Sequence, residues 1–336
     1  MSPRRIAAML SLVTLLAASG RAAARDDAPT RAQTAGAVER ALAWIAAEAY
    51  HFNHGFYTHW DREFWIWDTA VTIGLFDWLE ANGWTIDAYR VRVENARAWL
   101  ASVRRADGSF TYSTPNNPNT CNETTPTAAL AVPSKKTDAW IRGAQKPDGH
   151  WDVNLPGLSQ QDYPSVTALN LYAASCRGAD VNFAAAYAWF GAQEIEPVRN
   201  YYSTRFYALF ALAAVSSARD DFPDSLRASM TATVLKYADR GGAFEGRTMT
   251  DHPSAALSTA LALQTALWLD DPELRAVAGR AEEFLVRAQA GDGSFPGGRY
   301  SETSTKDETL FTTVNAARAL ALALLRAEGR TPASCP

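Results

Sequence analysis

Apolar residues recur at helical spacing along most of the chain, and the segments that carry them alternate with loops rich in Gly, Pro, Asn and Asp. This pattern predicts two sets of helices. One set is amphipathic, with charged residues on one side, and should lie outside with one face in water. The other set is apolar nearly all round and should lie inside. The predicted outer helices span about residues 34–51, 88–104, 135–146, 182–194, 223–238 and 272–290, and the inner helices about 64–81, 123–133, 162–176, 203–217, 252–268 and 307–326.

The strict alternation of outer and inner helices predicts an all-α protein with the (α/α)6 toroid architecture. In this architecture six hairpins close into a ring around a central cavity. We expect this single domain to span residues 34–328, because no alternating strand pattern competes with the helical one. An open α-solenoid built from the same hairpins would bury the same faces, and it remains the alternative.

A short turn recurs after several of the outer helices. Residues 145–151 read Gln-Lys-Pro-Asp-Gly-His-Trp and residues 289–295 read Gln-Ala-Gly-Asp-Gly-Ser-Phe, with weaker copies at 104–110 and 239–244. The glycine suits a position of positive φ where a helix ends, and the aromatic residue can fold back over the helix end. The glutamine can bond backbone groups freed at a helix terminus. We therefore expect a structural rather than a catalytic role for these turns.

The repeated Gln-x-x-x-Gly-x-aromatic pattern resembles the QW motif of the squalene and oxidosqualene cyclases and of the prenyltransferase β-subunit repeats. The turns at 145–151 and 289–295 match it fully, and the other two match in part. The resemblance implies a terpenoid-cyclase-like toroid whose cavity opens at the end where the inner helices begin. It implies little about activity, because the fold is also similar to those of complement-type thioester domains, cobalamin carriers and some polysaccharide lyases.

Polar side chains gather where the predicted inner helices begin, and five of the six helices offer a carboxylate there. The simplest interpretation is that these groups cap exposed N–H groups and complement the helix dipoles. The alternative is that carboxylates in an aromatic, low-dielectric cavity raise one another's pKa, so that one serves as a general acid or anchors a ligand. On this second interpretation the catalytic residues are Asp251, His252, Asp307 and Glu308, and the substrate-binding residues are Trp67, Asp68, Glu123, Asp162, Tyr163, Tyr202 and Arg205.

Within this set, Asp307 and Glu308 are the preferred acids because they are adjacent in the chain. His252 could act as a general base beside Asp251. In the fourth hairpin Arg205 replaces the carboxylate and would suit a uronate or phosphate group.

The chain departs from the chemistry of the families it resembles. The Asp-x-Asp-Asp motif of the cyclases is absent, so cyclisation would have to rely on a single buried acid. The Asp-x-Cys pair of the zinc-dependent protein prenyltransferases is also absent, which argues against that activity. Residues 121–124 read Cys-Asn-Glu-Thr where the thioester domains carry Cys-Gly-Glu-Gln, so a thioester cannot form.

Residues 51–61 hold three histidines and an aspartate, and His54, His59 and Asp61 are candidate ligands of a metal ion at the mouth. The spacing fits no zinc signature, and an aromatic-rich surface loop with incidental histidines explains the segment as well. We therefore expect no cofactor, with a metal ion as the alternative.

The N-terminus is typical of an export signal. A basic stretch at 2–5 precedes an apolar stretch at 6–18 and an A-x-A cleavage site at 22–24, which predicts a signal peptide over 1–24 and a polar linker over 25–33. A first core helix is the alternative interpretation. After cleavage the protein should not be an integral membrane protein, and it should lie in the periplasm or outside the cell.

Export implies an oxidising compartment in which the three cysteines can form one disulfide. Cys121 lies at the predicted mouth, about 20 Å along an inner helix from Cys176, beyond bridging distance. Cys335 follows the last inner helix at the far side. We therefore predict a Cys176–Cys335 bond that fixes the C-terminal tail at 329–336.

Composition narrows the range of partners. The 336 residues are 47% hydrophobic, which predicts a large core, and the net charge of −4 gives no field that would attract nucleic acid. Three functions remain open. They are acid catalysis on an isoprenoid-like or other apolar small molecule, cleavage of a uronate-containing glycan in the manner of a polysaccharide lyase, and non-catalytic binding of a ligand or protein.

Overall fold

The computed structural model describes residues 28–51, 53–57, 65–111, 115–153, 164–192, 205–244, 254–298 and 308–336. Within these ranges the side chains of Trp65 and Arg205 are not described. The predicted signal peptide and residues 25–27 of the predicted linker lie outside the described residues. The rest of the linker is described, and its last three residues belong to a helix that begins at Arg31 after the N-cap Thr30, so the predicted linker is too long by three residues.

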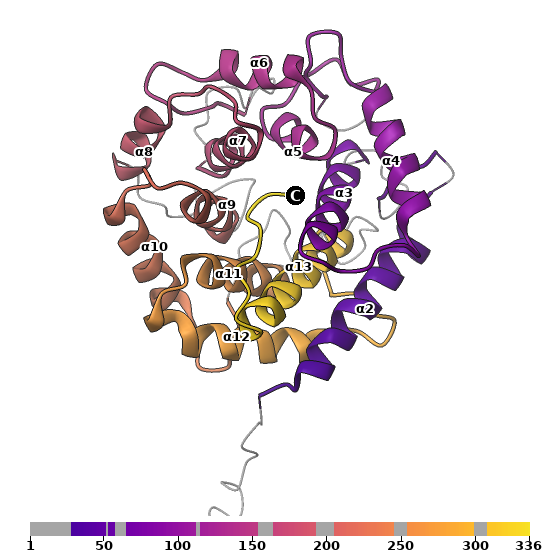
Figure 1. Ribbon diagram of the computed structural model, residues 1–336, viewed down its shortest axis with the longest axis vertical. Helices are drawn as coiled ribbons and strands as arrows, with labels where there is room; N and C mark the ends of the chain where they lie inside the picture. Colours follow the sequence, from indigo (N-terminus) through magenta and orange to yellow (C-terminus); the bar gives the residue numbers. More distant parts are fainter. Residues whose placement is uncertain are drawn as a thin grey trace, which may run out of the picture.

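The described residues form an all-α ring of six outer and six inner helices (Figure 1). The order of outer and inner helices is the one that the hydrophobic pattern predicts, and the bounds agree to within a few residues. The outer helices are α2 (Arg31–Glu48), α4 (Arg90–Ser102), α6 (Lys135–Ala144), α8 (Phe183–Ala192), α10 (Asp224–Tyr237) and α12 (Arg275–Ala288), the last preceded by a short 3-10 helix, η1 (Pro272–Leu274). The inner helices are α3 (Trp65–Ala81), α5 (Thr124–Ala131), α7 (Pro164–Arg177), α9 (Arg205–Ala218), α11 (Ala255–Leu269) and α13 (Thr309–Ala327).

The ring is closed, so the prediction of a toroid is confirmed and the open solenoid is wrong. Each inner helix packs against the next, and the last inner helix, α13, packs against both α2 and α3 at the beginning of the chain. At the same seam Thr34 Oγ1 donates to Glu282 Oε1 at 2.8 Å, and Arg40 donates to Gln289 Oε1. These contacts join residues almost 250 positions apart, at opposite ends of the domain.

Burial explains the two helix types. In α13 and α11 residues of every face are buried, because these helices are surrounded by neighbours in the ring. The helix α13 is long and apolar enough to cross a membrane, but 78% of its most apolar stretch is buried within the ring, as expected of a core helix.

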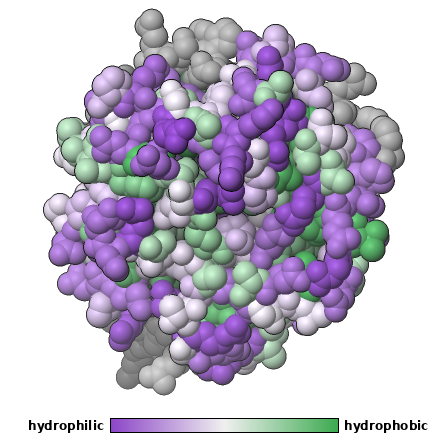
Figure 2. Space-filling model, turned by 45° about the horizontal axis from the view of Figure 1, so that its top comes forward, coloured by the Kyte–Doolittle hydropathy of each residue, from purple (hydrophilic) through white to green (hydrophobic). Residues whose placement is uncertain are grey.

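The predicted charged face of the fourth outer helix is wrong. The helix α8 contains no charged residue, and its exposed positions carry small side chains such as Ala184 and Ala188. Small residues expose little apolar area, so an outer helix can tolerate them in water. The face in Figure 2 is otherwise largely hydrophilic, and the described residues expose only Val91 and Leu235 among the large apolar side chains.

The repeated turns attach each hairpin to the next outer helix. Gly149 has φ +99°, and a Cβ there would lie 2.3 Å from backbone atoms of Ala185 and Ala186 in α8. Gly293 has φ +97° and approaches the Arg40 carbonyl of α2 in the same way, which closes the ring. The glycines of the two weaker copies make equivalent contacts. Only glycine allows this combination of conformation and close approach.

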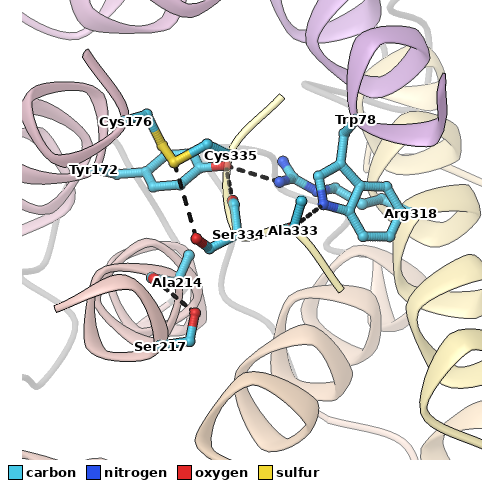
Figure 3. The surroundings of a disulfide bond; sticks show 9 residues. All are labelled: Trp78, Tyr172, Cys176, Ala214, Ser217, Arg318, Ala333, Ser334 and Cys335. Carbon is cyan, nitrogen blue, oxygen red and sulfur yellow. Dashed lines mark hydrogen bonds between the residues drawn. A yellow bond between two sulfur atoms is a disulfide. The ribbon is translucent and has the colours of Figure 1, made fainter. Parts of the chain in front are cut away.

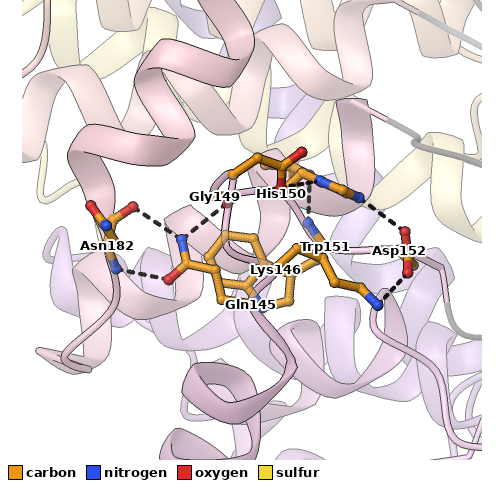
Figure 4. A network of polar contacts seen from close by, with 9 residues as sticks. Gln145, Lys146, Gly149, His150, Trp151, Asp152 and Asn182 are labelled. Atoms are coloured by element: carbon orange, nitrogen blue, oxygen red, sulfur yellow. Dashed lines mark hydrogen bonds and ion pairs between the residues drawn. The ribbon is translucent and has the colours of Figure 1, made fainter.

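The glutamines of the two full copies bond to freed backbone groups, as predicted. Gln145 Nε2 donates to the carbonyls of Gly149 and Asn182, and Gln145 Oε1 accepts from the Asn182 amide at 2.8 Å (Figure 4). Gln289 Nε2 likewise donates to the carbonyls of Gly293 and Ala37. Each glutamine thus joins its own turn to the start or the body of the next outer helix.

A second repeated contact joins each turn to the inner helix that follows it. The backbone N–H of the turn's aromatic residue donates to a threonine Oγ1 on that helix at 2.9 to 3.1 Å. The first of these turns is 51–57, where His54 occupies the glycine position with φ +69°. The described residues 51 and 53–57, which include His51 and His54, therefore form a further copy of the repeated turn. The pairs are Phe56 with Thr69, Phe110 with Thr125, Trp151 with Thr167, Phe244 with Thr259, and Phe295 with Thr313.

The C-terminal tail covers the axis of the ring at the end where the inner helices stop (Figures 1 and 3). The predicted Cys176–Cys335 disulfide is confirmed, with Cα atoms 5.4 Å apart. Trp78 Nε1 donates to the Ala333 carbonyl at 2.6 Å, and the Tyr172 hydroxyl donates to the Ser334 carbonyl at 2.8 Å. The tail thus bonds to α3 and α7 and closes this end of the ring.

Candidate functional site

The opposite end of the ring is the candidate functional site. All six inner helices begin there, and most segments outside the described residues come directly before an inner helix in the sequence. The described part of the site therefore consists of the first turns of the inner helices and the walls of the axis below them.

Three aromatic rings from three inner helices meet across the axis. Trp67 of α3, Tyr207 of α9 and Phe311 of α13 have ring centroids 5.5 to 6.1 Å apart. Because α9 lies across the ring from α3 and α13, this aromatic cluster spans the axis (Figure 1). The substrate-binding role that the sequence predicts for Trp67 stays a prediction.

Among the described carboxylates where the inner helices begin, Glu123 is the most deeply buried. It immediately precedes α5, is only 3% exposed, and makes no side-chain cap with its own helix. The preceding residues are fixed by two neighbouring turns, because the Cys121 amide donates to the Phe110 carbonyl and the Asn122 amide donates to the Val153 carbonyl. Capping therefore does not explain this buried acid.

Glu123 interacts electrostatically with Tyr207 of the aromatic cluster and with Cys121. Burial raises the pKa of Tyr207 well above its usual value, and the nearby Glu123 carboxylate raises it further. Burial raises the pKa of the Cys121 thiol to about 12, again with a contribution from Glu123. Glu123, Cys121 and Tyr207 thus share one water-poor site, in which Cys121 stays a neutral, fully buried thiol.

The described carboxylates Asp68 and Glu308, also near the starts of inner helices, are more exposed than Glu123. Asp68 is half-buried in the first turn of α3, where a negative charge is favourable near the positive helix end. Glu308 precedes α13 without capping it by its side chain, and its amide donates to the Gly298 carbonyl at 3.0 Å. The backbone of Gly297 lies so close that a Cβ there would be 2.3 Å from Glu308. Glu308 is therefore held rigidly at the rim.

The remaining predicted site residues are not tested by the structure. Arg205 begins α9, but its side chain is not described. The other predicted catalytic and binding residues that lie outside the described residues are Asp162, Tyr163, Tyr202, Asp251, His252 and Asp307.

His54 has a structural explanation. It occupies a turn position of positive φ, and its Nδ1 is 2.8 Å from the Tyr50 hydroxyl. The described residues contain no group of three or more His, Cys, Asp or Glu side chains that could hold a metal ion. The other two candidate ligands, His59 and Asp61, lie outside the described residues, so the alternative of a metal ion stays a prediction.

An axial cavity of about 50 Å³ lies below the aromatic cluster. Tyr207 and Phe311 line it toward the rim, and Tyr172, Arg318 and Pro336 line it toward the tail. Arg318 and Tyr172 were not predicted from the sequence to belong to the site. The available signal was an arginine in the middle of a largely apolar helix, whose other arginine, Arg326, lies in its last turn. The sequence alone does not show which face of α13 turns toward the axis.

Comparison with known proteins supports the fold. No family model matches the chain, and no curated protein matches it. Among solved structures, the type II terpene cyclase MstE from Scytonema is similar with a TM-score of 0.69 and 15% identity, over 88% of this chain and 99% of that one. The chain has the fold of the terpenoid-cyclase-like toroids.

Two further structures show how widely the fold is used. The ent-copalyl diphosphate synthase from Streptomyces platensis is similar with a TM-score of 0.52 and 18% identity, over 76% of this chain and 50% of that one. The GH76A alpha-1,6-mannanase from Salegentibacter sp. HEL1_6 has a TM-score of 0.57 and 12% identity, over 86% of this chain and 98% of that one. MstE has also been solved with geranylgeranyl dihydroxybenzoate as its substrate. At these identities the comparisons establish the fold and leave the chemistry open.

Proposed function

We propose that this protein is an exported enzyme that uses acid catalysis on an isoprenoid-like or other apolar small molecule bound at the rim end of the ring. The observation that carries the proposal is the position of Glu123, a buried carboxyl group beside the aromatic cluster of Trp67, Tyr207 and Phe311. The tail lies across the other end of the axis, so the rim end is the wider entrance for a ligand.

The chemistry follows from these groups. Burial favours the neutral form of a carboxyl group, which is the form that can donate a proton. Protonated Glu123 would transfer its proton to a carbon–carbon double bond of the ligand, leaving a carbocation on the ligand and a carboxylate on the protein. Aromatic faces stabilise a nearby cation. Loss of a proton from the rearranged cation then restores the acid, so that the product is an isomer of the substrate and no other reactant is required.

The size of the cavity limits where the ligand can lie. Pockets that hold small-molecule ligands usually measure about 300 to 1,000 Å³, whereas the axial cavity measures about 50 Å³. The body of an isoprenoid ligand would therefore lie mainly on the rim side of the aromatic cluster, between Glu123 and Glu308.

The decisive experiment compares Glu123→Gln, Glu308→Gln and Glu282→Gln with the wild type. Purified protein is incubated with geranylgeraniol and with prenylated aromatic compounds, and products of unchanged mass are sought by liquid chromatography with mass spectrometry. We expect Glu123→Gln to abolish turnover at an unchanged melting temperature, because the amide has no proton of suitable acidity to donate. Glu282 lies on an outer helix and serves as the matched control. Full turnover by Glu123→Gln would refute its role, and loss only in Glu308→Gln would move the acid to the rim.

Export is part of the proposal and has two supports. Residues 1–24 have the pattern of a signal peptide, and the Cys176–Cys335 disulfide is the kind of bond that persists in oxidising compartments. Expression of the full chain in a bacterial host, followed by fractionation and intact-mass analysis, should yield an exported form that begins near residue 25. A full-length chain that stays with the cytoplasmic fraction would contradict this part.

A glycan-cleaving enzyme is the second candidate, because a mannanase shares the fold and because carboxylates on separate inner helices could act as an acid and base pair. The same variants test it. Release of reducing ends or unsaturated ends from mannan or a uronate polymer, lost in Glu308→Gln, would favour this candidate over the first. Absence of both activities would favour a non-catalytic binding protein.

A further inference from the structure

Arg318 is the one charged side chain among the described residues that line the axial cavity. It comes from the middle of α13 and lies between two aromatic rings, with its guanidinium carbon 5.1 Å from the Trp78 ring and 5.9 Å from the Tyr172 ring (Figure 3). Its Nη2 donates to the Tyr172 hydroxyl at 2.8 Å. The arginine is thus held in one orientation at the tail end of the cavity.

Within the described ranges, no Asp or Glu side chain forms an ion pair with this cation. Two other partly buried arginines have acidic partners, Arg97 with Asp77 and Arg177 with Asp138, whereas Arg104 and Arg227 donate to backbone carbonyls. For Arg318 the described part of the chain offers no carboxylate within 4.0 Å, and its buried Nε has no acceptor there. The Tyr172 hydroxyl already donates to the Ser334 carbonyl and cannot supply a counter-charge. Arg318 is partly buried, and its guanidinium can make strong charge-assisted hydrogen bonds, so an anion in the cavity would be favourable.

The size and lining of the cavity select the kind of anion. A volume of about 50 Å³ corresponds to about three to five water-sized atoms, at about 10 to 15 Å³ for each. The carboxylate group and the first one or two carbon atoms of a longer ligand fit this space, whereas a phosphate brings more oxygen atoms and a second charge to a single guanidinium. The rest of the wall is mainly apolar, with Leu169 and Val314 among the lining residues.

The direction of the cavity shows where the rest of such a ligand would lie. The tail and the disulfide close the end near Arg318, and the aromatic residues Tyr207 and Phe311 line the other end. A carboxylate on Arg318 would therefore leave its apolar chain pointing toward the aromatic cluster and the rim.

We propose that the tail end of the axial cavity is a carboxylate-binding subsite, in which Arg318 holds the carboxylate end of an apolar ligand whose body extends toward the aromatic cluster. This proposal rests on the proposed function for the apolar class of the ligand. It adds a binding site for the polar end of that ligand. Binding can be measured without turnover, so the two proposals can fail separately.

The test uses octanoate and 1-octanol as probes, which share a chain length and differ in charge. Their affinities for the full chain, with its disulfide intact, are measured by isothermal titration calorimetry for the wild type, Arg318→Gln and Arg90→Gln. Arg90 is an exposed arginine on α4 and serves as the matched control. We expect Arg318→Gln to weaken octanoate binding at least about tenfold, because a charge-assisted hydrogen bond is lost. Octanol binding should be equal in all three proteins.

A second variant keeps the test informative if Arg318→Gln does not fold. Arg318→Lys retains the charge but not the planar fork, so it should bind octanoate more weakly than the wild type and more strongly than octanol. Equal binding of octanoate and octanol by the wild type, or unchanged octanoate binding by Arg318→Gln, would overturn the subsite. Octanoate binding that survives in Glu123→Gln while turnover is lost would support both proposals. Binding without any isoprenoid turnover would support the subsite and remove the proposed chemistry.

Discussion

The repeated turn makes a quantitative prediction at Gly149. In a Gly149→Ala variant the new Cβ would lie 2.3 Å from two backbone atoms of α8, in a residue whose φ is +99°. Holding a non-glycine residue in such a conformation costs about 1 to 3 kcal/mol. Forcing an extra methyl group into a packed contact costs about 1 to 3 kcal/mol more. The variant should therefore lose about 2 to 6 kcal/mol, a large part of the stability of a typical domain.

A matched control separates the contact from the substitution itself. Gly279 lies in the middle of α12, and a Cβ added there would meet no described atom within 4 Å beyond its own helix backbone. Gly279→Ala should therefore raise the free energy of unfolding by about 0.5 to 1 kcal/mol, because alanine has the higher helix propensity. Urea unfolding followed by far-ultraviolet circular dichroism gives both values. A loss below about 1 kcal/mol for Gly149→Ala, with the helix still in place, would refute the idea that the turn glycine sets the spacing between hairpin and outer helix.

Three further predictions concern the disulfide, the buried thiol and an acid at the ring seam. Replacing Cys176 and Cys335 by Ser should lower the free energy of unfolding by up to about 5 kcal/mol, because the unfolded chain gains the entropy of a loop with a sequence separation of 159 residues. Urea unfolding of the double variant should match that of the reduced wild type. A loss under about 1 kcal/mol would contradict the estimate. Cys121, whose pKa is raised to about 12 by burial, should not react with Ellman's reagent in the folded protein and should account for one thiol after unfolding without reductant. Burial raises the pKa of Glu282 above its usual 4.5, so the folded state binds this proton more tightly than the unfolded state does. The free energy of unfolding should therefore fall as the pH rises from about 4 to about 6. Glu282→Gln should flatten this slope in urea unfolding, and an unchanged slope would contradict the assignment.

The sequence predicted the ring because burial leaves a direct mark on residue type. The helix α11 is apolar on every face since it is enclosed, whereas α12 alternates charged and apolar positions since one face meets water. The turns at 145–151 and 289–295 were visible because their conformations and close contacts select particular residues. The same logic found the Cys176–Cys335 pair, since helix lengths placed both residues at one end.

Features that depend on the rotation of one helix against another were not predictable. The first copy of the turn was hidden because His54 replaces the glycine, so that the segment suggested a metal site instead. Asp307 was preferred over Glu123 on adjacency in sequence, but only packing shows that Glu123 lies in the dry region beside Tyr207. Arg318 was not predicted to line the cavity, because the packing of all the neighbouring helices determines which face of α13 turns toward the axis.

The seam between the last turn and the first helix constrains how the chain can fold. The surface of α2 that receives Gly293 and Gln289, and packs on α13, has no partner until some 250 further residues have been made. A chain growing from its N-terminus must therefore keep that apolar face exposed through the synthesis of five hairpins, which is a condition that favours aggregation. Chains that end before α13 should consequently depend on chaperones far more than the complete protein does, because the first helix is covered by the last.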